Sequence, residues 1–115
     1  LGKCKSILSK GGVVEIYPES RLPNPGEERP LEFKTSAVYL ALESGAKIIP
    51  IYNNAKYFTK DPMRIMIGKP IDVRELYRDD LSEKDNIENI NAYVRGKIIE
   101  YGNQIRLIDE GNEKQ

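Results

Sequence analysis

The sequence predicts a mixed α/β fold, in which strands joined by a crossover helix form a central sheet and a C-terminal amphipathic helix packs on it. Short runs rich in isoleucine, valine and tyrosine occur at residues 13–17, 47–52 and 63–67. A segment with a helical period lies between the first two runs, and a longer one follows the third. A strand, helix, strand order favours a parallel pair of strands joined by a right-handed crossover.

Glycine and proline residues mark the ends of the predicted N-terminal elements. Residues 2–10 have helical spacing, with Cys4 as a small packing residue, and Gly11-Gly12 ends the segment. The β-branched and aromatic run at residues 13–17 is typical of a short buried strand. Pro18 ends that run, because proline cannot donate to a sheet ladder.

The middle of the chain is predicted to form one helix followed by two strands. Residues 33–43 have apolar side chains at helical spacing, and Gly45 is a suitable stop. Residues 47–52 follow as a second buried strand, and residues 63–67 as a third that alternates around Arg64.

The C-terminal part is predicted to be helical. Residues 72–77 indicate a short helix, and Ser82 marks the start of a longer one. We expect the longer helix to pack on the sheet; a partner-binding or interfacial helix is the alternative. The tail at residues 109–115 is expected to fray. One face of the longer helix is apolar, with Ile87, Ile90, Val94, Ile98, Tyr101, Ile105 and Ile108 at three- and four-residue steps.

A charged turn, YPESR at residues 17–21, is the strongest candidate site. It follows a predicted strand, and open α/β sheets place their ligand crevice at the C-terminal ends of strands. Arg21 offers a planar fork of donors for phosphate or carboxylate, Ser20 adds a hydroxyl, and Glu19 orients the guanidinium or accepts a ligand hydroxyl. The alternative is a Glu-Arg pair that only holds a loop in place.

Several motifs in order resemble the glycerolipid acyltransferases, the 1-acyl-glycerol-3-phosphate acyltransferase family. GGVVEIYPESR at residues 11–21, followed by LEFK at residues 31–34, resembles the third block of that family. AKIIPI at residues 46–51 is similar to its fourth block, and IMIGKPI at residues 65–71 to the strand that follows. Ser20 stands where the family usually has glycine. The order and spacing of these motifs are more specific than any one of them.

The resemblance implies a division of roles. Residues 1–71 would be the C-terminal part of an acyltransferase domain, and residues 72–115 a helical extension packed on it. A fatty acyl group would move from acyl-carrier protein or coenzyme A to a phosphorylated glycerolipid acceptor. Arg21, with Glu19 and Ser20, would bind the acceptor phosphate, and Lys34 would assist from the first turn of the following helix. The family works at membrane surfaces, which implies a peripheral location at the inner face of the membrane.

The family base is a histidine in an HxxxxD motif upstream of the third block, and this chain contains no histidine. The chain begins at Leu1. We therefore expect a fragment that lacks the N-terminal half, has no catalytic residue of its own and is inactive alone. A free-standing module that binds anions without catalysis is the alternative.

The charge distribution and the motifs of the sequence limit the kinds of ligand and site that this chain could have. The first 60 residues carry 9 basic and 6 acidic residues, and the rest carry 9 and 12, so the half with the candidate site is mildly cationic. There is no arginine-rich patch or aromatic platform that would indicate a nucleic-acid partner. The sequence has no metal-ligand spacing and no glycine-rich nucleotide loop, so it calls for no metal or cofactor. The single cysteine excludes an internal disulfide.

Overall fold

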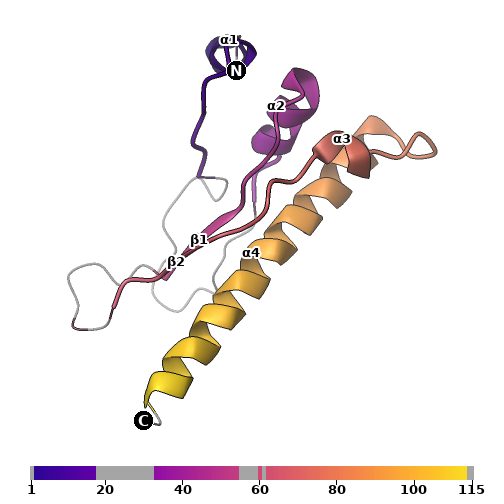
Figure 1. Ribbon diagram of the computed structural model, residues 1–115. Coiled ribbons are helices and arrows are strands. Elements are labelled where there is room, and N and C mark those ends of the chain that lie inside the picture. The colour runs from indigo at the N-terminus through magenta and orange to yellow at the C-terminus, as the bar shows by residue number, and fades with distance from the viewer. Residues whose placement is uncertain (1, 18–32, 55–59, 61, 114–115) are drawn as a thin grey trace.

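The computed structural model describes residues 2–17, 33–54, 60 and 62–113. Figure 1 shows a long C-terminal helix with a two-stranded ribbon beside it and shorter helices near one end. This arrangement confirms the predicted mixed α/β class with a C-terminal amphipathic helix. The described elements are α1 (Gly2–Ser9), α2 (Ser36–Ser44), β1 (Ile51–Asn53), β2 (Ile65–Ile67), α3 (Val73–Leu76) and α4 (Glu83–Glu113).

The predicted end of the first helix is confirmed, and the two glycines have different roles there. Gly11 has a φ of 82°, which glycine adopts without a steric penalty. Its N–H donates to the Leu8 carbonyl at 3.1 Å, and the Gly12 N–H donates to the Ile7 carbonyl at 2.9 Å, the pair of bonds of a Schellman motif. A Cβ at Gly12 would lie 2.6 Å from the Ile7 side chain. The Gly-Gly pair is therefore explained by helix termination.

The prediction of a buried strand at residues 13–17 is wrong. Residues 12–17 form no strand, and the side chains of Val13 and Tyr17 are 91% and 77% exposed. The Tyr17 hydroxyl donates to the Glu15 carboxylate at 2.9 Å, a local contact. β-branched residues favour a strand only where a neighbouring strand and a packed face are present, and no described strand pairs with this segment.

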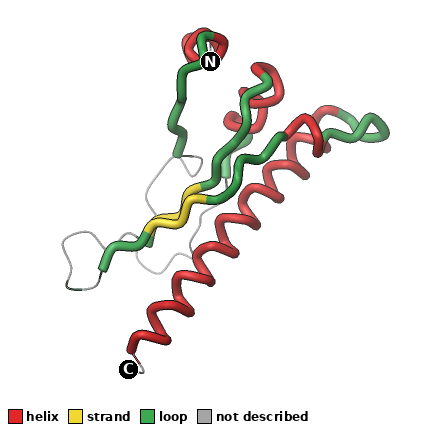
Figure 2. The backbone as a smooth tube through the Cα atoms, in the orientation of Figure 1, coloured by secondary structure: helices red, strands yellow, loops and turns green. Residues whose placement is uncertain are grey.

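The predicted parallel crossover between the first two strands is not formed, because residues 12–17 form no strand. The described strands, which are the second and third predicted ones, form an antiparallel ribbon (Figure 2). Ile51 lies opposite Ile67, and Asn53 lies opposite Ile65. The second and third predicted strands are thus present but shorter than expected. Beyond β1 and β2, an isolated bridge joins Ile48 and Ile71, which brings both side chains toward the core.

The core lies between α2, α3 and α4. Its buried cluster combines Val38 and Ala41 of α2 with Val73 of α3 and with Ile90 and Val94 of α4. The predicted apolar face of the long helix is confirmed over most of its length, although Ile108 is 45% exposed. The apolar period therefore directs α4 onto α2 and α3 as well as onto the ribbon.

Local signals fix the ends of α3 and the start of α4. The Asp72 carboxylate accepts from the Arg74 N–H at 3.1 Å, so Asp72 caps the predicted short helix. The Ser82 hydroxyl accepts from the Asp85 N–H at 3.1 Å at the start of α4, also as expected. The C-terminal tail, expected to fray from residue 109, is helical up to Glu113, and residues 114–115 lie outside the described residues.

The turn between α3 and α4 is organised by a buried asparagine. Asn86 is 1% exposed. Its side-chain carbonyl accepts from the Arg78 N–H at 2.7 Å, and its amide donates to the carbonyls of Arg78, Leu81 and Ser82 at 2.8, 3.3 and 3.1 Å. Every polar atom of this side chain is therefore satisfied within one corner of the fold.

Two reciprocal contacts between glycine and tyrosine hold the ribbon against α4. A Cβ at Gly68 would lie 2.6 Å from the ring of Tyr101, which belongs to the helix. A Cβ at Gly102 of the helix would lie 2.9 Å from the ring of Tyr52, which belongs to the ribbon. Each tyrosine ring thus packs directly on the backbone of a glycine, where any side chain would collide with the ring. This contact explains Gly102, a residue that is unfavourable inside a helix.

The chain is more extended than a compact domain of its size. Its radius of gyration is 16.0 Å, and its longest dimension is 49 Å. A compact chain of about 100 residues would have a radius of gyration of roughly 13 Å. The 31-residue α4 accounts for the difference, because at 1.5 Å per residue its length is about 46 Å. Within the described ranges, no helix is long and apolar enough to cross a membrane.

Candidate functional site

The predicted phosphate-binding turn falls on a part of the chain that the structure does not describe. Glu19, Ser20 and Arg21 all lie outside the described residues. Their proposed roles therefore remain predictions from the sequence. Lys34, the fourth predicted site residue, is described.

Lys34 lies just before α2, which corrects its predicted place in the first helical turn. The preceding residue, Phe33, is 5% exposed and anchors this segment in the interior. The Phe33 carbonyl accepts from the Asn91 side-chain amide at 3.0 Å, so α4 also fixes the backbone here. The Lys34 side chain is exposed to solvent. Lys34 is therefore an exposed cation that follows a residue fixed by its own buried side chain and by the hydrogen bond from Asn91.

The N-terminal end of α2 adds positive potential beside Lys34. The first N–H groups of a helix lack intrahelical partners and carry the positive end of the helix dipole. Thr35 precedes α2 but makes no capping hydrogen bond through its side chain, and no acidic residue occupies the first turn. This end of α2 therefore favours an anion.

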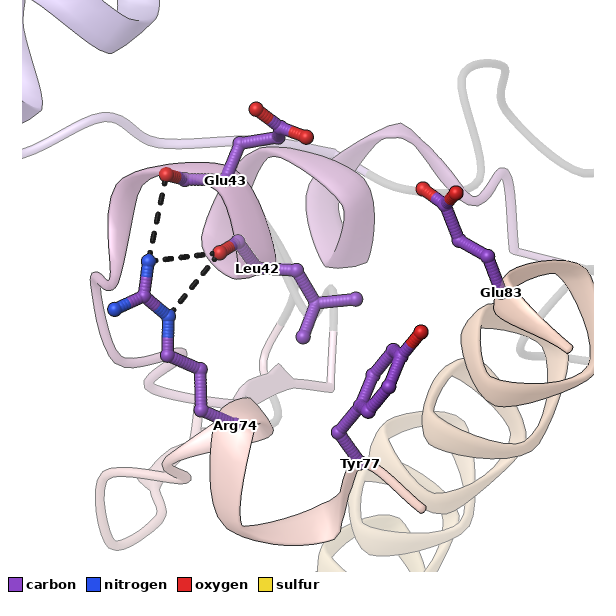
Figure 3. Close-up of a pocket in the computed structure, with 5 residues that line it drawn as sticks. All are labelled: Leu42, Glu43, Arg74, Tyr77 and Glu83. Atoms are coloured by element: carbon purple, nitrogen blue, oxygen red, sulfur yellow. Dashed lines mark hydrogen bonds between the residues drawn. The ribbon is translucent and has the colours of Figure 1, made fainter. Parts of the chain in front are cut away.

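A pocket lies at the opposite, C-terminal end of α2 (Figure 3). Its volume is about 320 Å³. Residues from α2, α3 and the start of α4 meet there, so three parts of the fold contribute to it. The lining residues are Leu42, Glu43, Arg74, Tyr77 and Glu83.

Arg74 is the central cation of this pocket, and it is already engaged by backbone. Its Nε and Nη2 donate to the Leu42 carbonyl at 3.2 and 3.0 Å, and Nη2 also reaches the Glu43 carbonyl at 3.4 Å. These carbonyls are among the last of α2, which have no intrahelical donors. Gly45 has a φ of 77°, and a Cβ there would lie 3.0 Å from the guanidinium. Arg74 therefore caps the C-terminus of α2 across a glycine.

The remaining groups make this end of α2 unsuitable for a phosphate. The C-terminal end of a helix carries the negative end of its dipole. Glu83 adds a carboxylate at the start of α4. Figure 3 shows the Glu43 side chain directed away from the guanidinium, and its carboxylate pairs with Lys5 of α1 at 3.2 Å. Arg74 stabilises the packing of α3 on α2 through its hydrogen bonds to the α2 carbonyls. The pocket therefore offers little to an anion.

Sequence reasoning did not identify this pocket. Arg74 lies in a short helix that is predicted from local signals alone, 32 residues from the Leu42 carbonyl that it caps. Only the Gly45 stop was visible in the sequence, and a glycine stop does not say which side chain lies over it. Among the described residues, no group of histidine, cysteine, aspartate and glutamate side chains is placed to hold a metal ion.

Comparison with protein families gives a match to part of the chain. Residues 1–54 match a family model described as Acyltransferase. Comparisons with curated proteins and with solved structures gave no match. The matched range includes the YPESR turn, Lys34, α1 and α2. The first 54 residues of this chain therefore carry the sequence pattern of an acyltransferase family.

Proposed function

We propose that this chain is the acceptor-binding part of an acyltransferase that moves a fatty acyl group from acyl-carrier protein or coenzyme A to a glycerol-phosphate lipid. The observation that carries the proposal is the acyltransferase match over residues 1–54, which contains the candidate site Glu19, Ser20, Arg21 and Lys34. In this proposal Arg21 binds the acceptor phosphate through a bidentate contact. Glu19 and Ser20 organise the turn.

The surroundings of Lys34 support an anionic acceptor. Lys34 is exposed on a backbone held by Phe33 and Asn91, beside a helix N-terminus without an acidic residue. A dianionic phosphate gains from both the lysine charge and the helix dipole. Lys34 contributes less than Arg21 in this proposal, because a lysine offers a point charge without a fixed fork of donors.

The base for acyl transfer has to come from outside these 115 residues, because histidine is the base implied by the resemblance and the chain has none. We therefore propose that the chain alone does not transfer acyl groups. Because the family that it resembles works at membrane surfaces, we also propose that it works at the inner face of a membrane. In-frame coding sequence for HxxxxD upstream of residue 1 would support the enzyme. A start codon directly before Leu1, or turnover by the purified 115-residue chain, would contradict this part of the proposal.

The absence of histidine also favours a second candidate function, a phosphate-binding module without catalysis. Both candidates need the same anion site. They differ in whether a histidine motif and an acyl donor complete the reaction. Acyl transfer to glycerol 3-phosphate by the longer gene product separates them.

Replacing Arg21 tests the site itself. Arg21→Ala should weaken binding of glycerol 3-phosphate by about 10- to 150-fold, which corresponds to the loss of a charge-assisted contact of about 1.5–3 kcal/mol. Lys34→Ala should weaken it less. Calorimetric titration of the 115-residue chain measures both dissociation constants, with glycerol as the ligand that lacks the phosphate.

Arg106→Ala is the matched control, because Arg106 is an exposed arginine on α4. It should leave the dissociation constant unchanged. Equal affinity of the wild type and Arg21→Ala for glycerol 3-phosphate would contradict the assigned role. Equal loss in Arg21→Ala and Arg106→Ala would show that only net charge matters.

A further inference from the structure

The two faces of the β1–β2 ribbon have different surroundings. Tyr52 lies on the face toward α4, against Gly102, and Met66 is its cross-strand partner. The opposite face, here called the outer ribbon face, carries side chains that alternate with these. Its apolar side chains are Ile49, Ile51, Met63, Ile65 and Ile67, and Asn53, opposite Ile65, lies on the same face.

The outer ribbon face is a concentrated apolar surface. Its five apolar side chains are 53%, 53%, 48%, 51% and 68% exposed in chain order. Ile51 and Ile67 are directly opposite each other in the register, so the patch is continuous across both strands. Monomeric proteins rarely expose contiguous apolar patches larger than a few hundred Å², and such patches mark interaction sites.

The described charges of the ribbon have one sign; Asp61, in the connection between the two strands, lies outside the described residues. The charged residues described at positions 46–54, 60 and 62–71 are Lys47, Lys60, Arg64 and Lys69. Arg64 turns to the helix side, where its Nε bonds the Asp109 carboxylate of α4 at 2.6 Å. The three lysines are exposed. The described acidic residues of this half of the chain belong to α3, α4 and the segments that flank α3.

We propose that the outer ribbon face rests on an anionic lipid surface. Aliphatic side chains on one face enter the boundary between headgroups and acyl chains, and flanking lysines contact anionic headgroups. α4, which carries seven acidic and four basic residues, contacts β1 and lies behind the ribbon, away from the lipid. The inference deepens the proposed function and rests on it in one respect, since a lipid acceptor would be met at this surface.

A second copy of the chain fits this face less well. Face-to-face packing of two ribbons would bring like charges together, because the described charges of each ribbon are all basic. Charge complementarity therefore selects an anionic surface.

Vesicle sedimentation with the full 115-residue chain tests the proposal. Wild type should bind vesicles of phosphatidylcholine and phosphatidylserine in equal parts, and bind phosphatidylcholine vesicles much less. Ile51→Glu combined with Ile67→Glu should reduce binding by roughly tenfold or more, since two inserted aliphatic groups become charges of the lipid's sign. Lys47→Glu and Lys69→Glu should each reduce binding about fivefold or more.

Control variants separate the ribbon from general surface effects. Leu107→Glu replaces a 63% exposed leucine on α4, and Lys84→Glu reverses an exposed charge on the same helix. Both should bind the mixed vesicles as the wild type does. Circular dichroism shows whether each variant keeps the helical signal of α4.

Four outcomes would overturn the proposal: no binding to mixed vesicles, equal loss in ribbon and control variants, a dimer that Ile51→Glu dissociates, or ribbon-dependent binding of acyl-carrier protein in place of vesicles. The test is independent of the acceptor site, because no turnover is measured and Arg21 is unchanged. Vesicle binding without glycerol 3-phosphate binding would reject the proposed function and retain the lipid surface. The reverse result would reject the lipid surface alone.

Discussion

The segment before residue 33 and the segment that begins there contribute differently to the packing of this molecule. The match to the acyltransferase family begins in the first segment, yet its described residues contribute no buried apolar side chain. Every buried apolar residue among those described lies at Phe33 or later. The comparison teaches that α2, α3 and α4 hold the described fold together, while the described residues before residue 33 add no buried apolar side chain to it. Substitutions in the two segments should therefore have separable effects.

The largest expected effect is on the core. Ile90→Ala removes a side chain that is 2% exposed at the centre of the cluster between α2, α3 and α4. It should lower the free energy of unfolding by about 2–5 kcal/mol. Urea denaturation followed by circular dichroism measures the change, and Ile90→Val, expected to cost about 0.5–1.5 kcal/mol, serves if the alanine variant does not fold.

Ile108→Ala is the control for this prediction, because Ile108 lies on the same helix and is 45% exposed. It should cost clearly less than Ile90→Ala. Equal losses from the two substitutions would mean that the core is not where the packing places it.

A smaller effect is expected at the corner between α3 and α4. Asn86→Ala leaves the Arg78 N–H and the carbonyls of Arg78, Leu81 and Ser82 without their side-chain partner. The expected loss is about 1–3 kcal/mol in the free energy of unfolding. Thermal and urea denaturation measure it. Asn103→Ala, at an exposed position of α4, should be nearly neutral, and a neutral Asn86→Ala would show that the corner does not need these bonds.

The smallest effect is expected in the segment that carries the motif. Val13 is 91% exposed, so Val13→Ala should change the free energy of unfolding by no more than about 0.5 kcal/mol. The same denaturation experiments measure it. A loss comparable to that of Asn86→Ala would show that Val13 is packed in solution, as the strand predicted from its sequence would require.

Elements with local signals could be predicted from the sequence. The end of α1 follows from Gly11-Gly12, the end of α2 from Gly45, and the start of α4 from Ser82, since each signal acts within one turn of helix. The apolar period of α4 likewise gave its buried face.

Features that depend on distant parts of the chain could not be predicted. The β-branched run at residues 13–17 has strand propensity, but a strand also needs a partner strand, which no local pattern supplies. The Arg74 cap and the contact of Tyr101 with Gly68 join residues about 30 positions apart. Of the candidate site, the structure gives the surroundings of Lys34, while Glu19, Ser20 and Arg21 remain predictions.

The division between recognition and packing is tested most directly by thermal unfolding of the wild type and of Arg21→Ala, each with and without glycerol 3-phosphate. A ligand that binds only the folded state raises the midpoint of unfolding. Without ligand, the two proteins should unfold at the same temperature; with ligand, the midpoint should rise for the wild type and stay unchanged for Arg21→Ala. An equal rise in both proteins, or a lower midpoint for Arg21→Ala without ligand, would contradict the account.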